Sequence, residues 1–288
     1  MITVDETLCN DCELCQKICH EYCIDFEGGK ISIQHNFCST CAQCIAICPR
    51  LALSWNGIRP SPYNRDLYPG PAQLDELFRE RRTIRDFKNR KIERPLLKEI
   101  VNFAAYAPTH SFERRLILLD DENLIQQMDR ILYRFSARLY RSFYRPGWVH
   151  AFIKAFAPSR EYEYLKAKPK LEAAVNRKRN FKTRPAAVVM VIGDRRVPLN
   201  LESAQYALYN IDLYAQSRGL GCRNLVGNQM FLNRSKSFRR LIGLKKREKI
   251  FGTLALGYPA VRFRNKVNGK YLDIQWNNEE KQRSGIII

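Results

Sequence analysis

The 288-residue sequence contains ten cysteines, and nine of them lie before residue 50. Thiols crowded in this way are either disulfide partners or metal ligands. The N-terminal segment MITVDETLC has no basic region followed by an apolar run, so we expect a soluble cytoplasmic protein. Stable disulfides are rare in a reducing compartment, and metal ligation is therefore our first interpretation. Eight of these cysteines form two runs with identical spacing: Cys9, Cys12, Cys15, Cys19 and Cys38, Cys41, Cys44, Cys48.

This CxxCxxCxxxC spacing is typical of bacterial proteins with two 4Fe–4S clusters, in which the fourth cysteine of each run binds the cluster of the other run. The two-residue gaps let one tight loop wrap three thiolates around a cubane, while the more distant fourth cysteine crosses over. Zinc is the alternative, but zinc sites use cysteine pairs rather than triplets. We therefore predict cluster one on Cys9, Cys12, Cys15 and Cys48, and cluster two on Cys38, Cys41, Cys44 and Cys19.

Residues 1–56 resemble two-cluster ferredoxins along their whole length. The segment ISI fits the strand between the repeats, and CPRLALSW fits the closing turn and strand. The proline that follows such a run is replaced by His20 in the first run, whereas Pro49 follows the second. We expect Cys23 to be a small buried side chain rather than a ligand. The resemblance implies a module that moves single electrons.

The formal net charge of +20 is unevenly distributed. Residues 1–56 hold three basic and seven acidic residues, a net charge of −4, and the remainder of the chain carries +24. Such asymmetry predicts either two domains that attract each other or a basic domain that binds an acidic partner.

Residues 57–72 are rich in proline, glycine and asparagine, which indicates a linker, and residues 73–288 form a second domain of α+β composition. We expect one helix in AQLDELFRERRTIRDF and another that opens at Pro95. The apolar runs RPAAVVMVIGD and IFGTLALGYPA predict buried strands. NLESAQYALYNIDLYAQSRGLG predicts a long helix with a glycine stop.

Four segments, RERRTIRDF, AAYAPTHS, RGLGCRNLVG and LALGYP, resemble landmarks of the FMN-dependent nitroreductase family and occur in the family's order. The resemblance implies an α+β homodimer with two FMN molecules at its interface, each held by both subunits. The fold class we expect is α+β, with an N-terminal ferredoxin-like 2[4Fe–4S] module followed by a nitroreductase-type flavin domain.

The resemblance also implies the flavin-binding residues. The FMN phosphate suits the guanidinium groups and hydroxyl of the first segment, although a cluster of arginines on a solvated helix face is the alternative reading. The second segment would approach the flavin ring and ribityl chain, where His110 is either a proton donor or a simple loop residue. At Phe112 and Arg114 the family has Asn and Gln, so we assign these two positions no role. The predicted residues are Arg81, Arg82, Thr83, Arg85, Pro108, Thr109, His110 and Ser111.

Two later segments complete the expected site. Val226 and Gly227 align with the segment whose backbone amide meets flavin N5, where glycine allows a close approach. Arg264 is our choice among Arg262, Arg264 and Lys266 for completing the phosphate site. Cys222 is a lone cysteine after Gly-Leu-Gly and is expected in the core.

Residues 131–157 interleave aromatic residues with arginines, and we interpret residues 131–184 as a lid that selects substrate. Tyr140, Phe143, Tyr144 and Trp148 are candidates for an aromatic pocket, and a core face or contact with an anionic membrane surface are the alternatives. Basic runs at 166–170 and 176–184 suit an acidic docking partner better than nucleic acid, because the sequence has no recognisable nucleic-acid reading element.

We therefore expect an iron–sulfur flavoprotein oxidoreductase that passes electrons to an electron-poor small molecule such as a nitroaromatic or a quinone. Its donor would be a ferredoxin, a flavodoxin or NAD(P)H, and no dedicated catalytic acid or base is evident. The alternative is a non-catalytic redox-sensing or nucleic-acid-binding flavoprotein. Another flavin reaction, such as reductive dehalogenation or ring reduction, would suit the same site.

Overall fold

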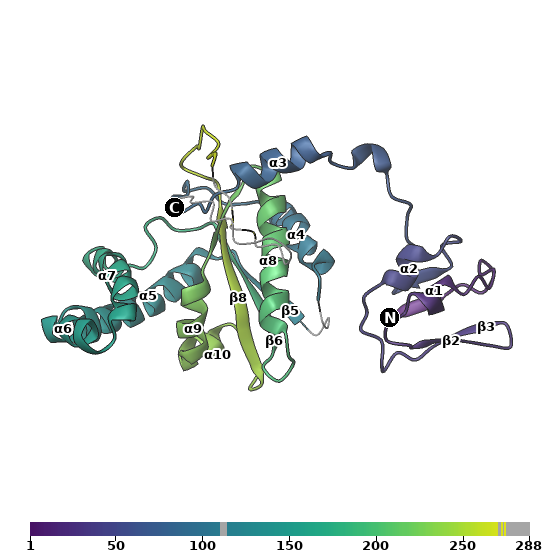
Figure 1. The fold of residues 1–288 in the computed structure, drawn as a ribbon, viewed down its shortest axis with the longest axis horizontal. Coiled ribbons are helices and arrows are strands. Elements are labelled where there is room, and N and C mark those ends of the chain that lie inside the picture. Colours follow the sequence, from purple (N-terminus) through teal and green to yellow (C-terminus); the bar gives the residue numbers. More distant parts are fainter. Residues whose placement is uncertain (110–113, 270–271, 273, 275–288) are drawn as a thin grey trace.

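The structure, a computed structural model, describes residues 1–109, 114–269, 272 and 274. It consists of an N-terminal module, an extended linker and a larger α+β domain (Figure 1). Among these described residues, none of the helices has the length and apolar character needed to cross a bilayer.

The N-terminal module contains two small antiparallel sheets and two short helices. Strand β1 pairs with β4, and β2 pairs with β3. Isoleucine, leucine and cysteine side chains fill its core, including Ile2, Ile24 and Leu53. The strands expected in ISI and CPRLALSW are both present. The elements are β1 (Ile2–Val4), α1 (Leu14–Lys17), β2 (Ile24–Glu27), β3 (Lys30–Ile33), α2 (Gln43–Ile47) and β4 (Leu53–Trp55).

The two cysteine runs fold as two copies of one loop. Six of the seven non-glycine residues of this module with left-handed backbone form pairs that are 29 residues apart, the same interval that separates Cys9 from Cys38, and Asn56 is the exception. Each such residue costs about 1–2 kcal/mol, and backbone strain of this kind collects where a site demands a particular loop. The pairs are Asp11 and Thr40, Glu13 and Ala42, and Tyr22 and Leu51.

The larger domain is a three-layer structure around a four-stranded antiparallel sheet with the order β5-β6-β8-β7. The strands are β5 (Arg114–Leu119), β6 (Ala187–Asp194), β7 (Gly221–Asn224) and β8 (Glu248–Gly257). Strand β6 is buried except at its last residue, and β8 is buried from Ile250 onward, which confirms the two predicted central strands. Strands β5 and β7, at the two edges of the sheet, were not predicted.

Each face of the sheet has its own apolar core. Helices α4 (Arg94–Asn102) and α8 (Asn200–Ser217) cover one face, where Leu208 and Ile211 pack on Val189 and Val191. Helices α5 (Glu122–Leu139), α9 (Val226–Arg234) and α10 (Lys236–Leu241) cover the other face. Helix α8 ends at the predicted glycine stop, because Gly219 has a left-handed φ of 74°.

The first predicted helix of this domain is shorter than expected. Helix α3 (Pro71–Glu80) stops before the arginine motif, and residues 81–85 continue as extended chain. The backbone N–H of Ile84 donates to the carbonyl of Cys222 at 2.9 Å, so this segment runs along the free edge of β7. The motif is therefore held by the sheet edge rather than by a helix.

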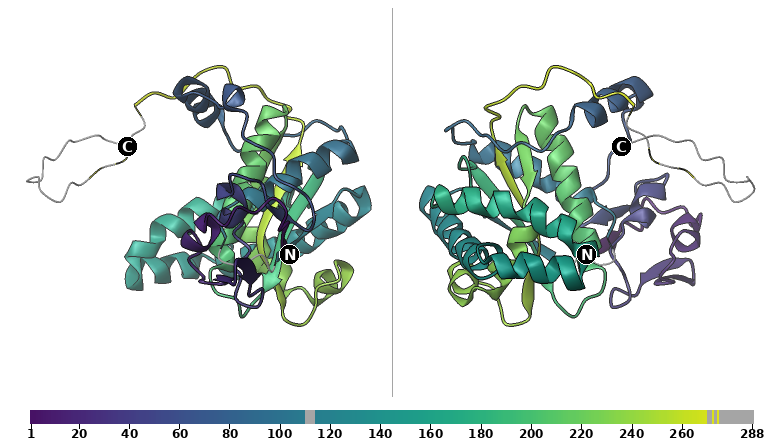
Figure 2. Two further views of the ribbon diagram at one scale, coloured as in Figure 1. Left: turned by 90° about the vertical axis from the view of Figure 1, so that its right-hand side faces the viewer. Right: turned by 60° about the vertical axis from the view of Figure 1, so that its left-hand side comes forward.

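Helices α5, α6 (Gly147–Phe156) and α7 (Glu161–Asn176) form one group beside the sheet, as Figures 1 and 2 show. The π-helical turn η3 (Tyr140–Tyr144) ends just before Pro146, and α6 begins directly after it. Asp129 on α5 fixes the chain that follows α7, because its carboxylate accepts the N–H groups of Asn180 at 3.0 Å and Phe181 at 2.8 Å.

Asp129→Ala is expected to lower the free energy of unfolding by about 2 kcal/mol, because it leaves two backbone N–H groups without an acceptor beside the buried Phe181 ring. Urea titration would measure the change. Asp75→Ala, which removes an exposed carboxylate paired with Arg79, is the control and should cost less than about 0.5 kcal/mol. Equal losses for the two variants would contradict the anchoring role of Asp129.

Candidate functional site

Four cysteines drawn from both runs line one small cavity of about 10 Å³ in the N-terminal module. Cys9, Cys12 and Cys15 come from the first loop, whereas Cys48 comes from the end of the second. Phe26, Ile31 and Leu53 form the apolar part of the wall. The cavity thus gathers the crossed set that was predicted for cluster one.

The remaining four cysteines form a second neighbourhood. The pKa of the Cys44 thiol is raised to about 11, mainly by burial and then by the nearby charges of Cys41 and Cys38. Cys19 lies with this group through Cys23, because the two sulfurs are 3.5 Å apart and Cys38 also acts on Cys23. Cys23 is buried, as expected, and burial first and Cys19 second raise its pKa to about 12.

Each donor set supplies four thiols, the ligand number of a 4Fe–4S cluster. In the part of the chain that the structure describes, no three His, Cys, Asp or Glu side chains converge closely enough to hold one metal ion. A cubane keeps its four thiolates farther apart than a zinc ion does, because iron and sulfide atoms lie between them. Two backbone amides, of Ala52 and Thr40, also donate to Cys48 Sγ at 3.3 Å and Cys38 Sγ at 3.4 Å. Such bonds tune the potential of an iron–sulfur centre.

In the larger domain, the predicted arginine motif lies along the β7 edge, but its side chains have different partners. The Arg81 guanidinium lies 3.6 Å from the Asp212 carboxylate, whose pKa is raised by burial despite this cation. Arg82 donates to the carbonyls of Arg79 at 2.6 Å and of Arg81 itself at 2.8 Å. Thr83 is half-buried and Arg85 is exposed.

Arg223 on β7 is a candidate that sequence reasoning missed. Its guanidinium lies over the Phe181 ring, 5.9 Å from the centroid. Burial lowers its pKa, and the like charges of Arg85 and Arg177 lower it further. Three cations close together, one of them largely desolvated, favour an anionic ligand. Strand alternation next to the buried Cys222 could have revealed this position, but β7 itself was not predicted.

Of the other predicted contributors, Val226 and Gly227 lie at the same edge, whereas the cavity beside Gly221 is lined by Arg262 and not by the preferred Arg264. Val226 and Gly227 are exposed at the start of α9, directly after β7. Arg264 lies in an exposed segment between Ala260, whose N–H donates to the carbonyl of Asp86 at 2.9 Å, and Lys266, which is paired with Glu76 on α3. The structure thus gathers three of the four predicted flavin segments at the β7 edge.

The fourth predicted segment lies elsewhere. Pro108 is exposed and Thr109 half-buried just before β5, the opposite edge of the sheet, while His110, Ser111 and Phe112 lie outside the described residues. Three strand spacings of about 4.8 Å separate the two edges, roughly 14 Å in all. The segment that holds Pro108 and Thr109 therefore leads into the strand at the opposite edge from the arginine motif.

Gly221 allows the arginine segment to lie against β7. A Cβ atom at this position would stand 2.3 Å from Ile84 Cγ1 and 2.8 Å from Ile84 Cβ. Gly221→Ala is expected to displace residues 81–85 and to lower the free energy of unfolding by about 1–3 kcal/mol, with loss of bound flavin. Gly147→Ala, where an added Cβ would meet nothing within 4 Å, is the control. Thermal unfolding that is unchanged in Gly221→Ala would contradict the close approach.

The aromatic residues of the predicted lid do not form one pocket. Tyr144 stacks on Tyr164 with ring centroids 4.7 Å apart, and His150 stacks on the same ring at 5.4 Å. Phe143 and Trp148 are exposed to 54% and 70%. Tyr140 donates its hydroxyl to Glu172 at 3.0 Å. Cys222 is buried, as predicted.

Comparison with known proteins gives a family match. Residues 78–258 match the sequence model of the Nitroreductase family. A nitroreductase with bound FMN from Desulfitobacterium hafniense DCB-2 is 16% identical, with 69% of this chain and 97% of that chain covered and a TM-score of 0.50. An FMN-dependent nitroreductase from Clostridium difficile R20291 is 19% identical, with coverages of 71% and 99% and a TM-score of 0.47. No curated protein sequence gives a match.

Proposed function

We propose that this chain, which belongs to the nitroreductase family, is an iron–sulfur flavoprotein oxidoreductase. Electrons would pass from two 4Fe–4S clusters in residues 1–56 to FMN in the larger domain, and then to an electron-poor organic acceptor such as a nitroaromatic or a quinone. The observation that carries the proposal is the cavity lined by Cys9, Cys12, Cys15 and Cys48 in the same chain as the family domain.

The chain's own residues would hold these groups. When bound, the clusters would supply single electrons and FMN would deliver them to the acceptor. The two crossed cysteine sets would ligate as thiolates, so metal binding must displace protons from Cys15 and Cys44, whose pKa values are raised by burial. The amides of Thr40 and Ala52 would stabilise negative charge on the ligating sulfurs.

The β7 edge supplies what FMN requires. Arg85 and Arg223 have no carboxylate partner among the described residues and are available for an oxyanion. Thr83 and Arg264 would add a hydroxyl and a third cation, with Arg81 and Arg82 supporting the segment through their own contacts. The exposed backbone at Val226 and Gly227 is open to a planar ring.

We infer that the active form is a homodimer. The segment of Pro108 and Thr109 leads into β5, the opposite edge of the sheet from the arginine motif, and a second copy would bring the two segments together at the interface. Apolar side chains beside α8 are available for that contact, since Tyr106, Tyr206 and Tyr209 are exposed to 77%, 54% and 43%. The external donor would be a ferredoxin, a flavodoxin or NAD(P)H.

Metal and flavin analysis of anaerobically purified protein tests the proposal directly. We expect about eight iron atoms per chain, from two four-iron clusters, and one FMN. Stopped-flow reduction should then bleach the flavin, and a nitroaromatic or a quinone should restore its colour. Colourless protein without flavin, or flavin that stays oxidised while the clusters are reduced, would refute the function.

A further inference from the structure

A strongly basic surface occupies the end of the sheet where β5 begins and β6 ends. Two cavities of about 570 and 610 Å³ flank the turn that leads into β8. Together their walls contain eleven lysine and arginine residues but only two carboxylates, Asp194 and Glu248. We call this surface the basic pole; it is formed by Arg114–Arg115, Arg195–Arg196, α10 and Lys245–Lys249.

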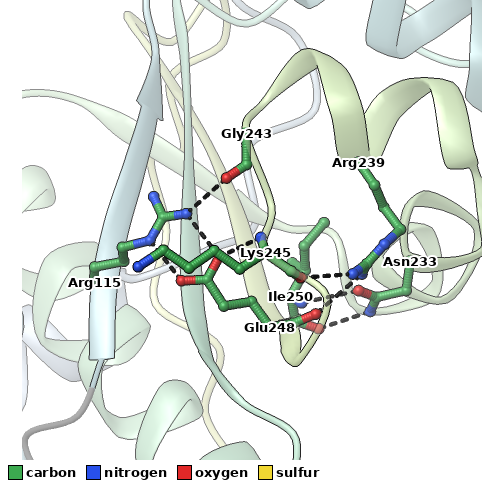
Figure 3. Close-up of polar contacts among 7 residues, drawn as sticks. All are labelled: Arg115, Asn233, Arg239, Gly243, Lys245, Glu248 and Ile250. Atoms are coloured by element: carbon green, nitrogen blue, oxygen red, sulfur yellow. Dashed lines mark hydrogen bonds and ion pairs between the residues drawn. The ribbon is translucent and has the colours of Figure 1, made fainter.

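A hydrogen-bond network holds the basic pole in shape (Figure 3). Glu248 accepts two bonds of 2.9 Å from Arg115 and one of 2.8 Å from the backbone N–H of Lys245. The bonds from Arg115 are the main reason that the pKa of Glu248 falls to about 2. Arg239 donates to the carbonyls of Lys245 at 3.0 Å and Glu248 at 3.1 Å. The turn is therefore fixed by the Glu248 carboxylate together with the guanidinium groups of Arg115 on β5 and Arg239 on α10.

The two carboxylates of the pole, Asp194 and Glu248, are already paired with arginines of the pole itself. Asp194 is bound by the guanidinium and backbone N–H of Arg196 at 2.7 and 2.9 Å, and its pKa also falls to about 2. Lys236, Arg240 and Lys246 are exposed and have no carboxylate partner among the described residues. Like charges held together on a rigid surface repel one another, and an acidic partner would relieve that repulsion.

We propose that the basic pole is the docking surface for the acidic N-terminal module of the same polypeptide, an inference that rests on the proposed electron path. The module carries a net charge of −4, and ligating thiolates would make it more negative. Exposed carboxylates stand next to its cysteines, with Asp11 between Cys9 and Cys12 and Glu21 two residues after Cys19.

The linker is long enough for this docking. Residues 57–70 form a largely exposed segment that contains one 3₁₀ turn, η1 (Arg65–Leu67), and fourteen residues can span at most about 50 Å when fully extended. The linker ends at α3, which lies near the C-terminal end of β8, whereas the pole lies at the N-terminal end of the same strand (Figure 1). Strand β8 has ten residues and is about 33 Å long, which is shorter than the reach of the linker. Tethering also gives the module a millimolar effective concentration, so that weak, screened ion pairs suffice.

In the proposed dimer, docking at the pole would bring the clusters toward the flavin segment that holds Pro108 and Thr109, whereas the arginine motif of the same chain lies near the opposite end of β8. Arg114, which lines the pole, is only five residues after Thr109, so at most about 18 Å of chain separates them. Nucleic acid would be drawn to the same charge. The module is the better occupant because it is already attached, and because no aromatic side chain that could stack on a base lines either cavity.

Zero-length carbodiimide coupling of the metallated full-length protein tests contact without relying on activity. Peptide mapping should find links from Asp11 or Glu21 to Lys236, Lys245, Lys246 or Lys249, and about 0.5 M salt should abolish them. Links that go instead to lysines of 166–182, or links between separate molecules only, would overturn the proposal.

Charge reversal supplies the second test. In Lys236→Glu/Arg240→Glu/Lys246→Glu, transfer from the clusters to the flavin should be at least about tenfold slower at low salt, and wild-type transfer should slow as salt rises. The matched control is Lys91→Glu/Lys98→Glu/Arg130→Glu, which reverses three exposed cations outside the pole and outside residues 131–184 and should stay within roughly twofold of wild type.

The two tests separate the two proposals. Transfer that proceeds equally fast in the pole variant refutes the docking surface and leaves the oxidoreductase intact. Wild-type protein whose clusters never reduce its flavin refutes the electron path, even where the expected links form. Tight binding of a DNA oligonucleotide that the pole variant loses, without any link to the module, would reassign the surface to nucleic acid and overturn the docking proposal.

Discussion

Cys48→Ala is expected to remove about half of the iron from anaerobically purified protein, from about eight atoms per chain to about four. Cys48 shares its cavity with Cys9, Cys12 and Cys15, so its loss removes a ligand from the first site and leaves the second complete. Iron and sulfide analysis with electron paramagnetic resonance of the reduced protein would show one remaining cluster. Cys23→Ala, which removes a buried thiol outside both predicted ligand sets, is the control and should keep all the iron.

Paired substitutions decide whether the ligands truly cross between the runs. If they cross, Cys9→Ala/Cys48→Ala damages a single cluster and retains about half the iron, whereas Cys9→Ala/Cys19→Ala damages both clusters. If each run binds its own cluster, Cys9→Ala/Cys19→Ala retains about half the iron, and Cys9→Ala/Cys48→Ala damages both clusters. The second pattern would show that the predicted ligand assignment is wrong.

Arg85→Ala is expected to weaken FMN binding by roughly 10- to 100-fold, the effect of losing a charge-assisted hydrogen bond to an anion. Arg85 is exposed beside Arg223, and neither guanidinium has a carboxylate partner among the described residues, so the substitution removes cofactor contact without orphaning a protein group. Fluorescence titration of apoprotein with FMN would measure the affinity.

Arg90→Ala is the matched control for Arg85, because it removes an exposed arginine from the same segment whose guanidinium lies 4.1 Å from the centroid of the Tyr258 ring. Its flavin affinity should match that of wild type. If Arg85→Ala bound FMN as tightly as wild type, the phosphate site would have to lie elsewhere than at the β7 edge. Arg81→Ala is less suitable, because it would leave the largely buried Asp212 without its cation.

The parts of the fold that follow a simple pattern could be predicted from sequence. Strand β6 is a continuous apolar run between breakers, and helix α8 has a regular period and a glycine stop, so tertiary context only confirms them. Strands β5 and β7 lack such a signal. The first begins with Arg114 and Arg115, and the second is the short GCRN, so both are strands mainly because they pair with β6 and β8.

The functional site shows the same difference between features set by local sequence and features set by contacts between distant segments. Cysteine spacing is a local property of the chain, and it predicted a crossed set that the structure gathers around one cavity. The flavin side depends on contacts between distant segments. Arg223 could not be ranked above the other arginines until Phe181, Arg177 and Arg85 were placed around it. Likewise, sequence gave no reason to pair Arg81 with Asp212, which are 131 positions apart.

The 29-residue interval in the N-terminal module has a historical consequence. An ancestral protein with a single CxxCxxCxxxC run would have supplied three thiols to its own iron–sulfur cluster and the fourth thiol to the cluster of a second, identical chain. Tandem duplication of the gene would place both copies in one chain, in which each copy still provides one cysteine ligand to the cluster of the other. Neither half would mature alone, so a chain cut between Gly28 and Gly29 should yield two fragments that assemble their cofactors only when mixed.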